Sequence, residues 1–288
     1  MTIRPRRSAL YKPGSNARAL EKAKSLDADV VIFDREDAVA PEVKGQAREQ
    51  VMAAVQGGGY GRREVVVRIN GLGSDFIEDD IAAMKGTGVD ARLVPTIESG
   101  SDIERLEAML GDAPEGLKLW AMIETPLGIV NVAEIARCAA RPGARLSCFV
   151  IGTNDLVKET RAELDGERTA AFYWLSATVT AARAFGIDVL DGVYNDFKDI
   201  TGFKRECAQG RMFGMDGKTV IHPTQIEAAN EAFSPAEDEV QWARRILAAF
   251  EEPENHGKGV INMDGRMVEL LHAEMAKRTV AIADAIGR

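Results

Sequence analysis

The stretch LKLWAMIETPLG, residues 117–128, holds the pattern that decides the fold. Its apolar run is rich in strand-forming residues and ends abruptly at Glu124, and Pro126 follows two residues later. A proline at that point stops the strand, because it cannot donate a ladder hydrogen bond. The stretch therefore predicts a buried strand that delivers a carboxylate to its exit.

Seven further short runs of strand formers end in polar residues, glycine or proline. They are SALYKP (8–13), DVVIFD (29–34), EVVVRIN (64–70), ARLVP (91–95), LSCFVIG (146–152), IDVLDG (187–192) and KTVIHP (218–223). Most are continuously apolar, as expected of strands buried on both faces of a parallel sheet. Segments with helical spacing, such as 98–110 and 167–185, lie between them.

About eight strand–helix repeats in one chain predict an α/β fold of the (β/α)8 TIM barrel type. A doubly wound open sheet is the alternative. It is less favoured, because no glycine-rich dinucleotide fingerprint follows any of the runs.

The pattern changes after residue 230. Residues 234–250 predict a helix capped by Ser234, and residues 260–270 predict a small hairpin around Asp264 and Gly265. A final helix is expected to run to the C-terminus. We therefore expect residues 1–230 to form the catalytic barrel and residues 231–288 to form a C-terminal extension of helices and a hairpin.

The composition limits the function. The chain has 288 residues, 45% of them hydrophobic, and a formal net charge of -9, which argues against a nucleic-acid partner or an acidic membrane surface. Its three cysteines form no CxxC pair, which fits a reducing compartment. We find no signal peptide and no apolar run of roughly 20 residues. The expectation is a soluble cytoplasmic protein.

The carboxyl ends of the strands form the active face of a TIM barrel, and polar residues collect there in this sequence. They are Asp34, Glu36, Asp37, Arg68, Asn70, Glu98, Glu124, Asn154, Asp155, Asp191, Asn195 and His222. Carboxylates gathered at one rim repel each other unless a cation lies among them, and hard oxygen ligands suit Mg²⁺. We predict Glu124 and Asp155 as the metal ligands, although each could instead cap the helix that follows it.

Several other patterns fit a purely structural role as well as a functional one. The planar fork of Arg68 suits a bidentate carboxylate, but an arginine at a strand end can also extend to the barrel rim. The four charged residues 34–37 could form a solvated turn. YKPGSNARALEKA (11–23) could bind phosphate or be a plain loop–helix junction. His222 could be a packed rim histidine, and Asp264 a hairpin residue.

Taken together, the motifs resemble the citrate lyase β-subunit-like branch of the HpcH/HpaI aldolase superfamily, close to malyl-CoA and citramalyl-CoA lyases. The resemblance extends from about Arg7 to MDGRMVE (263–269). It rests on RSALYKPGSNARALEKA, VVIFDREDAVAPEVKGQAR, VVVRING, VPTIES, AMIETPLGIVN, CFVIGTNDL and GMDGKTVIHPTQI, which occur in this order.

The resemblance implies a barrel that assembles as trimers or hexamers and uses Mg²⁺ and a coenzyme A thioester. Such enzymes cleave or form a carbon–carbon bond between acetyl-CoA or propionyl-CoA and an α-keto acid. By this resemblance Glu124 and Asp155 bind the metal, Arg68 orients the keto acid, and Glu36 and Asp37 lie near metal-bound waters. Asp264 would be the acid–base residue, in an extension that helps to close a neighbouring subunit's active site.

The resemblance also implies a set of residues near the substrate or coenzyme A. They are Tyr11, Lys12, Pro13, Ser15, Asn154, His222 and Pro223. Two departures from the family pattern put the substrate in doubt. Arg35 replaces a usually apolar residue, and GTNDLVKETRAEL (152–164) differs from the commoner ending of its loop.

Three other activities fit the same motifs. The site could hydrolyse the thioester of a malyl-CoA-type substrate. The chain could be the β subunit of a multi-component citrate lyase that acts on an acyl-carrier-protein thioester, although the negative net charge offers no clear docking patch for an acidic carrier. The barrel could also bind a coenzyme A ester without chemistry.

Overall fold

The computed structural model describes residues 3–84, 86–111 and 113–287. The chain divides into two compact units. The first is Arg6–Ala232, and the second comprises the described parts of Met1–Pro5 and Phe233–Arg288.

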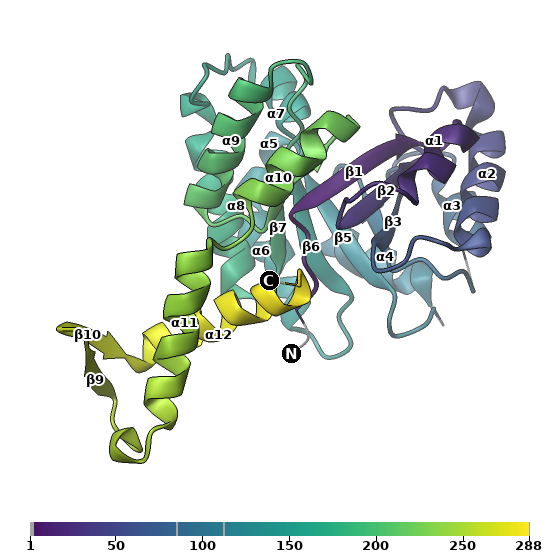
Figure 1. Cartoon of the computed structure of the whole chain (residues 1–288). Coiled ribbons are helices and arrows are strands. Elements are labelled where there is room, and N and C mark those ends of the chain that lie inside the picture. The colour runs from purple at the N-terminus through teal and green to yellow at the C-terminus, as the bar shows by residue number, and fades with distance from the viewer. Residues whose placement is uncertain (1–2, 85, 112, 288) are drawn as a thin grey trace. The chain divides into compact units, whose positions relative to one another are not determined.

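In the described residues of the first unit, eight parallel strands close into a barrel, in which β1 pairs with both β2 and β8 (Figure 1). The predicted (β/α)8 barrel is therefore confirmed. The strands are β1 Ser8–Pro13, β2 Val30–Asp34, β3 Glu64–Arg68, β4 Ala91–Val94, β5 Lys118–Ile123, β6 Leu146–Ile151, β7 Asp188–Asp191 and β8 Gly217–Val220.

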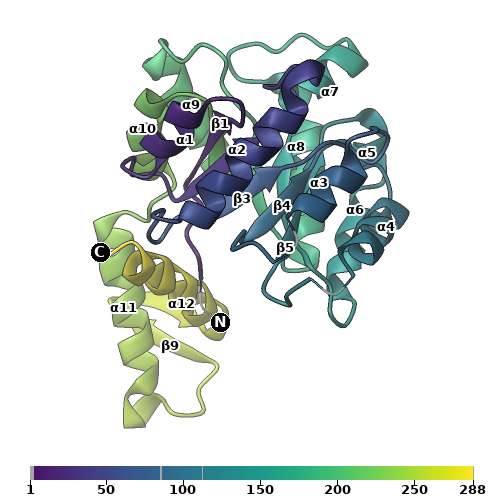
Figure 2. The ribbon, with the colours of Figure 1, turned by 90° about the vertical axis from the view of Figure 1, so that its right-hand side faces the viewer.

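Helices follow the strands and lie outside the barrel, as α2 and α3 do beside β3 and β4 in Figure 2. They are α1 Ala17–Ala23, α2 Lys44–Gly57, α3 Ile77–Ala83, α4 Gly100–Leu110, α5 Pro126–Val130, α6 Val132–Arg137, α7 Thr153–Thr160, α8 Phe172–Ala184, α9 Ile200–Phe213 and α10 Ile226–Ala232. Pro126 is the first residue of α5, and the Thr125 hydroxyl caps it by accepting from the Gly128 N–H at 3.0 Å.

Alternation along the strands decides which side chains face the barrel interior. The inward-facing residues form one buried cluster, which includes Ala9, Val30, Ile32, Val66, Leu93, Trp120, Met122 and Val150. Because the side-chain period of a strand is two, the same parity turns Tyr11, Asp34, Arg68 and Glu124 inward at the carboxyl ends. The fold thus collects polar groups on one end of an apolar core.

A buried ion cluster occupies the opposite end of the barrel. The Arg6 guanidinium donates to both carboxylate oxygens of Glu64 at 2.7 and 2.8 Å and to Asp188 at 2.7 Å. It also lies over the Trp120 ring, 4.8 Å from the ring centroid. Polar contacts at this amino-terminal end of a barrel support stability rather than chemistry.

The second unit contains α11 Glu237–Glu251, the antiparallel strands β9 Val260–Met263 and β10 Arg266–Glu269, and α12 Leu270–Ala285. The predicted hairpin is confirmed. The predicted cap at Ser234 is wrong, because α11 begins at Glu237. Ala236, the residue before the helix, donates its backbone N–H to the Glu239 carboxylate at 2.8 Å. Alternate hairpin residues Ile261 and Val268 pack into a small core with α11 and α12.

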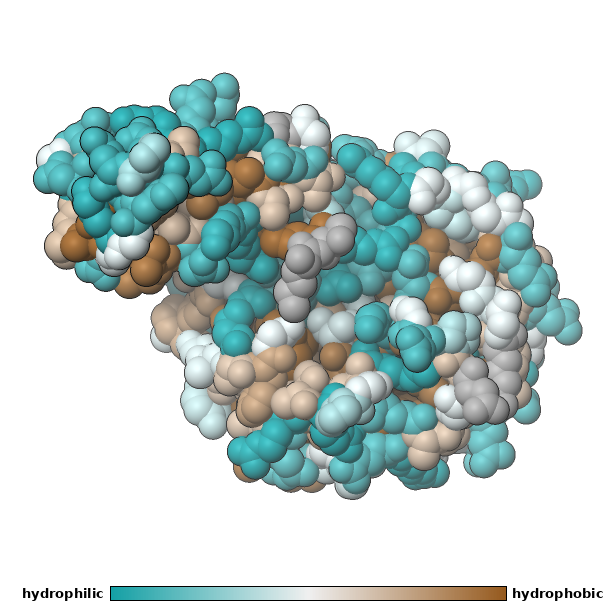
Figure 3. Space-filling model, turned by 90° about the horizontal axis from the view of Figure 1, so that it is seen from below, coloured by the Kyte–Doolittle hydropathy of each residue, from teal (hydrophilic) through white to brown (hydrophobic). Residues whose placement is uncertain are grey.

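In the described part of the chain, the helices are too short or too polar to cross a membrane. Figure 3 shows hydrophilic residues over much of the visible surface, broken by smaller patches of hydrophobic residues. Such a mixture is ordinary for a protein surface, much of which is apolar even in water.

Candidate active site

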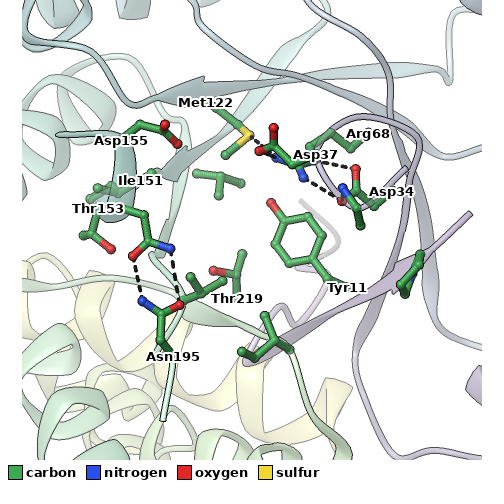
Figure 4. A pocket seen from close by; sticks show the side chains of 17 residues that line it. Tyr11, Asp34, Asp37, Arg68, Met122, Ile151, Thr153, Asp155, Asn195 and Thr219 are labelled. Carbon is green, nitrogen blue, oxygen red and sulfur yellow. Dashed lines mark hydrogen bonds and ion pairs between the residues drawn. The ribbon is translucent and has the colours of Figure 1, made fainter. Parts of the chain in front are cut away.

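A cavity of about 410 Å³ lies at the carboxyl ends of the barrel strands, where the sequence predicts the active face (Figure 4). Charged side chains occupy its two sides, and apolar side chains lie between them. Its lining includes Tyr11, Pro13, Asp34, Asp37, Arg68, Met122, Val150, Gly152, Thr153, Asn154, Asp155, Asn195 and Thr219.

The Arg68 guanidinium is engaged by Asp34, the residue that faces it across the β2–β3 ladder. Its Nε and Nη2 atoms donate to the two Asp34 oxygens at 2.7 and 2.6 Å. The predicted bidentate carboxylate is therefore one of the chain's own side chains. The Nη1 atom is turned away from Asp34 and contacts Glu36 at 2.8 Å and Asp37 at 3.3 Å.

The acidic loop after β2 is tied to this pair. The Asp34 carboxylate accepts from the backbone N–H groups of Glu36 and Ala38 at 2.9 and 3.2 Å, so one side chain orders both Arg68 and the loop. Burial raises the pKa of Glu36 to about 7, although the Arg68 charge opposes this shift. A carboxylate with a pKa near neutrality can act as a general base.

Glu124 lies at the exit of β5, as predicted, and only 5% of it is exposed. Its Oε1 accepts from both the backbone N–H and the hydroxyl of Thr96, at 2.7 and 3.2 Å. Burial raises its pKa to about 7. The Thr96 hydrogen bond opposes this rise, and the Asp155 charge adds to it. The two predicted metal ligands thus repel each other electrostatically.

Two backbone features hold Glu124 in place. Thr96 has a φ of 55°, a left-handed conformation that is unusual for a β-branched residue and that is found most often at functional sites. Gly152, at the exit of β6, leaves room for the carboxylate, because a Cβ there would lie 2.6 Å from Glu124 Oε2. The site therefore needs a strained threonine and a glycine.

The donor set fits Mg²⁺. Among the described residues, no group of three or more His, Cys, Asp or Glu side chains is arranged to hold a metal ion. Two carboxylates are nevertheless the usual protein share of a magnesium site, which is completed by water and substrate oxygens. Glu124 and Asp155 offer such a pair, and a divalent cation would relieve their mutual repulsion.

Tyr11 and Asn154 join this site from other strands. The Tyr11 ring lies beneath Arg68, with 5.2 Å between the guanidinium carbon and the ring centroid, and Figure 4 shows its hydroxyl directed into the cavity. Asn154 and Asn195 exchange amide hydrogen bonds at 3.3 and 2.8 Å. They connect the loops that follow β6 and β7.

The structure separates the predicted residues into two groups. Those that line the cavity are Tyr11, Pro13, Asp37, Arg68, Asn154 and Asp155. The lining does not include the remaining barrel candidates among the described residues, namely Lys12, Ser15, Glu36, Glu124, His222 and Pro223. Two of them nevertheless touch residues of the lining. Glu36 forms an ion pair with Arg68, and Glu124 packs against Gly152.

The other candidates outside the lining lie close by on the barrel. Lys12 follows Tyr11 on β1, so its side chain lies on the other face of the strand, where it is buried. Burial and the like charge of Lys22 lower its pKa. Ser15 is exposed, and Asn16 rather than Ser15 caps α1. His222 stacks on Phe197, with 4.6 Å between the ring centroids. Pro223 begins the short helical turn after it.

Asp264 belongs to the second unit and occupies the β9–β10 turn with a φ of 53°. Its carboxylate pairs with Arg245 at 2.6 Å and is mostly exposed. A groove of about 790 Å³ between α11 and the hairpin includes both residues.

The structure explains one of the two departures from the family pattern. Arg35 is turned away from the cavity, is almost fully buried, and forms an ion pair with Asp80 of α3. The second departure, residues 152–164, includes α7, which ends at Arg161 in the left-handed conformation. Gly152 and the first turn of α7 supply the cavity wall, and residues 161–164 follow the end of the helix.

Sequence reasoning placed Asp34 at the active face without giving it a role, and it missed Gly152 and Thr96 as functional candidates. Asp34 has the parity of Val30 and Ile32, a signal that marks it as inward-facing. Gly152 could have been suspected as a glycine at a strand exit. Thr96 carries no signal in the sequence, because its role depends on an unusual backbone conformation.

The fold and site together define a TIM barrel with an acidic, arginine-containing active face. The profile of the HpcH/HpaI aldolase/citrate lyase family matches residues 7–223, and the chain belongs to this family. The resemblance read from the sequence motifs is confirmed.

Individual relatives cover nearly the whole chain. A (3S)-malyl-CoA thioesterase from Cereibacter sphaeroides is 48% identical over 283 residues, which are 98% of this chain and 96% of the relative. The citrate lyase subunit beta of Leuconostoc mesenteroides subsp. cremoris is 35% identical over 289 residues, 98% of this chain and 94% of the relative.

A solved structure is similar over the same extent. The protein CitE from Mycobacterium tuberculosis, in complex with magnesium, acetoacetate and coenzyme A, has a TM-score of 0.74 and 30% sequence identity to this chain. The match covers 96% of this chain and 97% of that one.

Gly152→Ala tests the packing of Glu124. The added methyl group must displace the carboxylate, so we expect a loss of about 1–3 kcal/mol in the free energy of unfolding. Gly45→Ala is the matched control, because a Cβ at Gly45 of α2 meets no atom within 4 Å. Chemical denaturation measures the free energy of unfolding of both variants. Equal stability of the two variants would contradict the packing described here.

Glu124→Gln tests the burial of charge in the metal-free protein. The pKa of Glu124 is raised to about 7 in the fold, so the protonated carboxyl is favoured there and stability is lost as the pH rises from about 4.5 to 7. The glutamine variant lacks this loss. With chelator present, its stability relative to wild type should improve by roughly 2 kcal/mol between pH 4.5 and pH 8. A difference that is constant with pH, measured by chemical denaturation, would overturn this assignment.

Proposed function

We propose that this protein is a magnesium-dependent enzyme that cleaves a 3-hydroxy-dicarboxyl thioester of coenzyme A, such as malyl-CoA. The observation that carries the proposal is the buried Glu124 carboxylate, whose pKa the charge of the partly exposed Asp155 raises and the charge of Arg68 lowers. Similar proteins support it, since one is a (3S)-malyl-CoA thioesterase and another is in complex with magnesium, acetoacetate and coenzyme A.

Glu124 and Asp155 are the residues that would hold Mg²⁺. The bound ion supplies Lewis-acid polarisation of the substrate oxygens. Arg68 contributes its Nη1 atom, since Asp34 occupies the rest of the guanidinium. A hydrogen bond from Nη1 to an oxygen that gains negative charge stabilises the transition state. Tyr11 places its phenol beside Arg68, where the hydroxyl can donate to a substrate oxygen.

Lys12 and Lys22 support the binding of a phosphorylated ligand. Lys12 is buried, and its pKa is lowered by burial and by the like charge of Lys22. Two ammonium groups held close together are stabilised by an anion, and the phosphates of coenzyme A would serve. In the same proposal Pro13, Ser15, Asn154, His222 and Pro223 contact the thioester or the nucleotide.

Thioester hydrolysis is the reaction that we place first. A water oxygen forms a bond to the thioester carbonyl carbon while Glu36, assisted by Asp37, takes its proton. The carbon–sulfur bond then breaks, and the thiolate of coenzyme A takes the proton back. The raised pKa of Glu36, about 7, suits a base near neutral pH. The malyl-CoA thioesterase is the more similar of the two named relatives, at 48% identity against 35%.

Carbon–carbon cleavage, to acetyl-CoA and an α-keto acid such as glyoxylate, pyruvate or oxaloacetate, is the second candidate. Glu36 takes the proton of the substrate hydroxyl, the carbon–carbon bond breaks as the keto acid forms, and the acetyl-CoA enolate takes a proton from the protonated carboxyl of Asp264. Asp264 is the acid that the family resemblance implies for this step, and it lies in the exposed turn between β9 and β10.

The assembly is part of the proposal. We place residues 1–230 as the catalytic barrel and residues 231–288 as an extension that helps to close the site of a neighbouring subunit in a homotrimer or hexamer. We also place the protein in the cytoplasm, free of nucleic-acid and membrane partners. A role as a citrate lyase β subunit would instead require partner chains that co-purify with it.

Product analysis separates the two reactions. Purified protein is incubated with Mg²⁺ and malyl-CoA, and the products are identified by mass spectrometry. Hydrolysis gives malate and free coenzyme A, whereas cleavage gives glyoxylate and acetyl-CoA. Citramalyl-CoA and citryl-CoA are tested in parallel. Turnover that is unchanged in chelator, or no turnover of any of the three thioesters, would contradict the proposal.

Asp264→Asn is the matched variant. Hydrolysis needs no acid at the α-carbon, so the variant should keep the formation of malate within about threefold while any formation of glyoxylate falls at least a hundredfold. Cleavage at the wild-type rate in this variant would remove Asp264 from the mechanism.

A further inference from the structure

A buried lysine lies behind the acidic loop, outside the cavity lining of the described residues. Lys44 is the first residue of α2 and is 9% exposed. Its Nζ atom donates to the carbonyl oxygens of Arg35 and Glu36 at 3.1 and 3.0 Å, and to Asn70 Oδ1 at 2.6 Å. Three donors and three acceptors saturate the ammonium group.

The acceptors come from two different strand exits. Arg35 and Glu36 directly follow β2, and Asn70 follows β3, two residues after Arg68. A charged donor makes stronger hydrogen bonds than a neutral one, and burial strengthens them further. Lys44 therefore connects the loop that carries the acidic residues to the strand that carries Arg68.

Asn70 is itself held in place by Asp80 of α3. Its backbone N–H and side-chain Nδ2 both donate to Asp80 Oδ2, at 3.0 and 2.6 Å. The other Asp80 oxygen accepts from Arg35 and, at 3.1 Å, from Arg48 Nε. The unusual Arg35 thus helps to hold the Asp80 carboxylate, which orients the amide of Asn70 towards Lys44.

We propose that Lys44 is a positioning residue, whose ammonium group pins the backbone of residues 35 and 36 to Asn70 and thereby holds Glu36 and Asp37 against Arg68. Its importance for catalysis rests on the proposed function. Its effect on the loop does not, because the contacts between Glu36, Asp37 and Arg68 are features of the fold.

The test compares Lys44→Met with Val55→Ala. Val55 is buried on the same helix, so its truncation costs packing but leaves the loop contacts intact. Hydrogen–deuterium exchange followed by mass spectrometry reports on residues 33–43. We expect exchange there to rise at least tenfold in Lys44→Met and to match wild type in Val55→Ala. Unchanged exchange in folded Lys44→Met would overturn the proposal.

A double-mutant cycle tests the link to Asn70. Removal of either end of the contact should loosen the loop, so Lys44→Met with Asn70→Ala should exchange no faster at residues 33–43 than the faster single variant. Additive effects would contradict the proposal. If Lys44→Met does not fold, Lys44→Gln, which removes the charge but keeps a neutral donor nitrogen, takes its place with the same two outcomes.

Kinetics separate this proposal from the proposed function. On the thioester that the enzyme turns over, kcat should fall at least tenfold in Lys44→Met, with KM within about threefold and Val55→Ala unaffected. A lost kcat without faster exchange would indicate a purely electrostatic role and contradict positioning. If no thioester is turned over, the proposed function fails, and the exchange data still decide the role of Lys44.

Discussion

The Glu124 carboxylate is buried at the exit of β5, so its ionised form is costly, and the charge of the partly exposed Asp155 adds to that cost. The surrounding backbone does not avoid this cost. Thr96 adopts a strained conformation to present its N–H, and Gly152 omits a side chain to leave space. In the proposed function these features prepare the site for a cation, which would relieve the repulsion between Glu124 and Asp155.

The cationic side of the site is held by the chain's own acids. Asp34 engages two of the three nitrogens of the Arg68 guanidinium, so only Nη1 is directed at Glu36, Asp37 and the cavity. Lys44 fixes the loop from behind. Since each of these groups is held by at least two contacts, binding and catalysis require little rearrangement of the barrel, which is the condition for effective electrostatic catalysis.

The sequence was sufficient for the barrel and for the position of Glu124 at a strand exit, because apolar runs that end at polar residues indicate both. For Arg68 it left two directions open, and the structure places this residue in the cavity lining. The pairing of Asp34 with Arg68 was not predictable, since it depends on the register between β2 and β3. The direction of Arg35 depends on Asp80, which lies 45 residues later in the chain. The positive φ of Thr96 leaves no mark in the sequence.

The central claim is that Glu124 and Asp155 bind one divalent ion. Mn²⁺ replaces Mg²⁺ at oxygen sites and gives an anomalous signal in X-ray diffraction. A crystal grown with Mn²⁺ should show one strong peak about 2.1 Å from a carboxylate oxygen of each residue. The absence of a peak at saturating Mn²⁺, or a peak held by other side chains, would contradict the account.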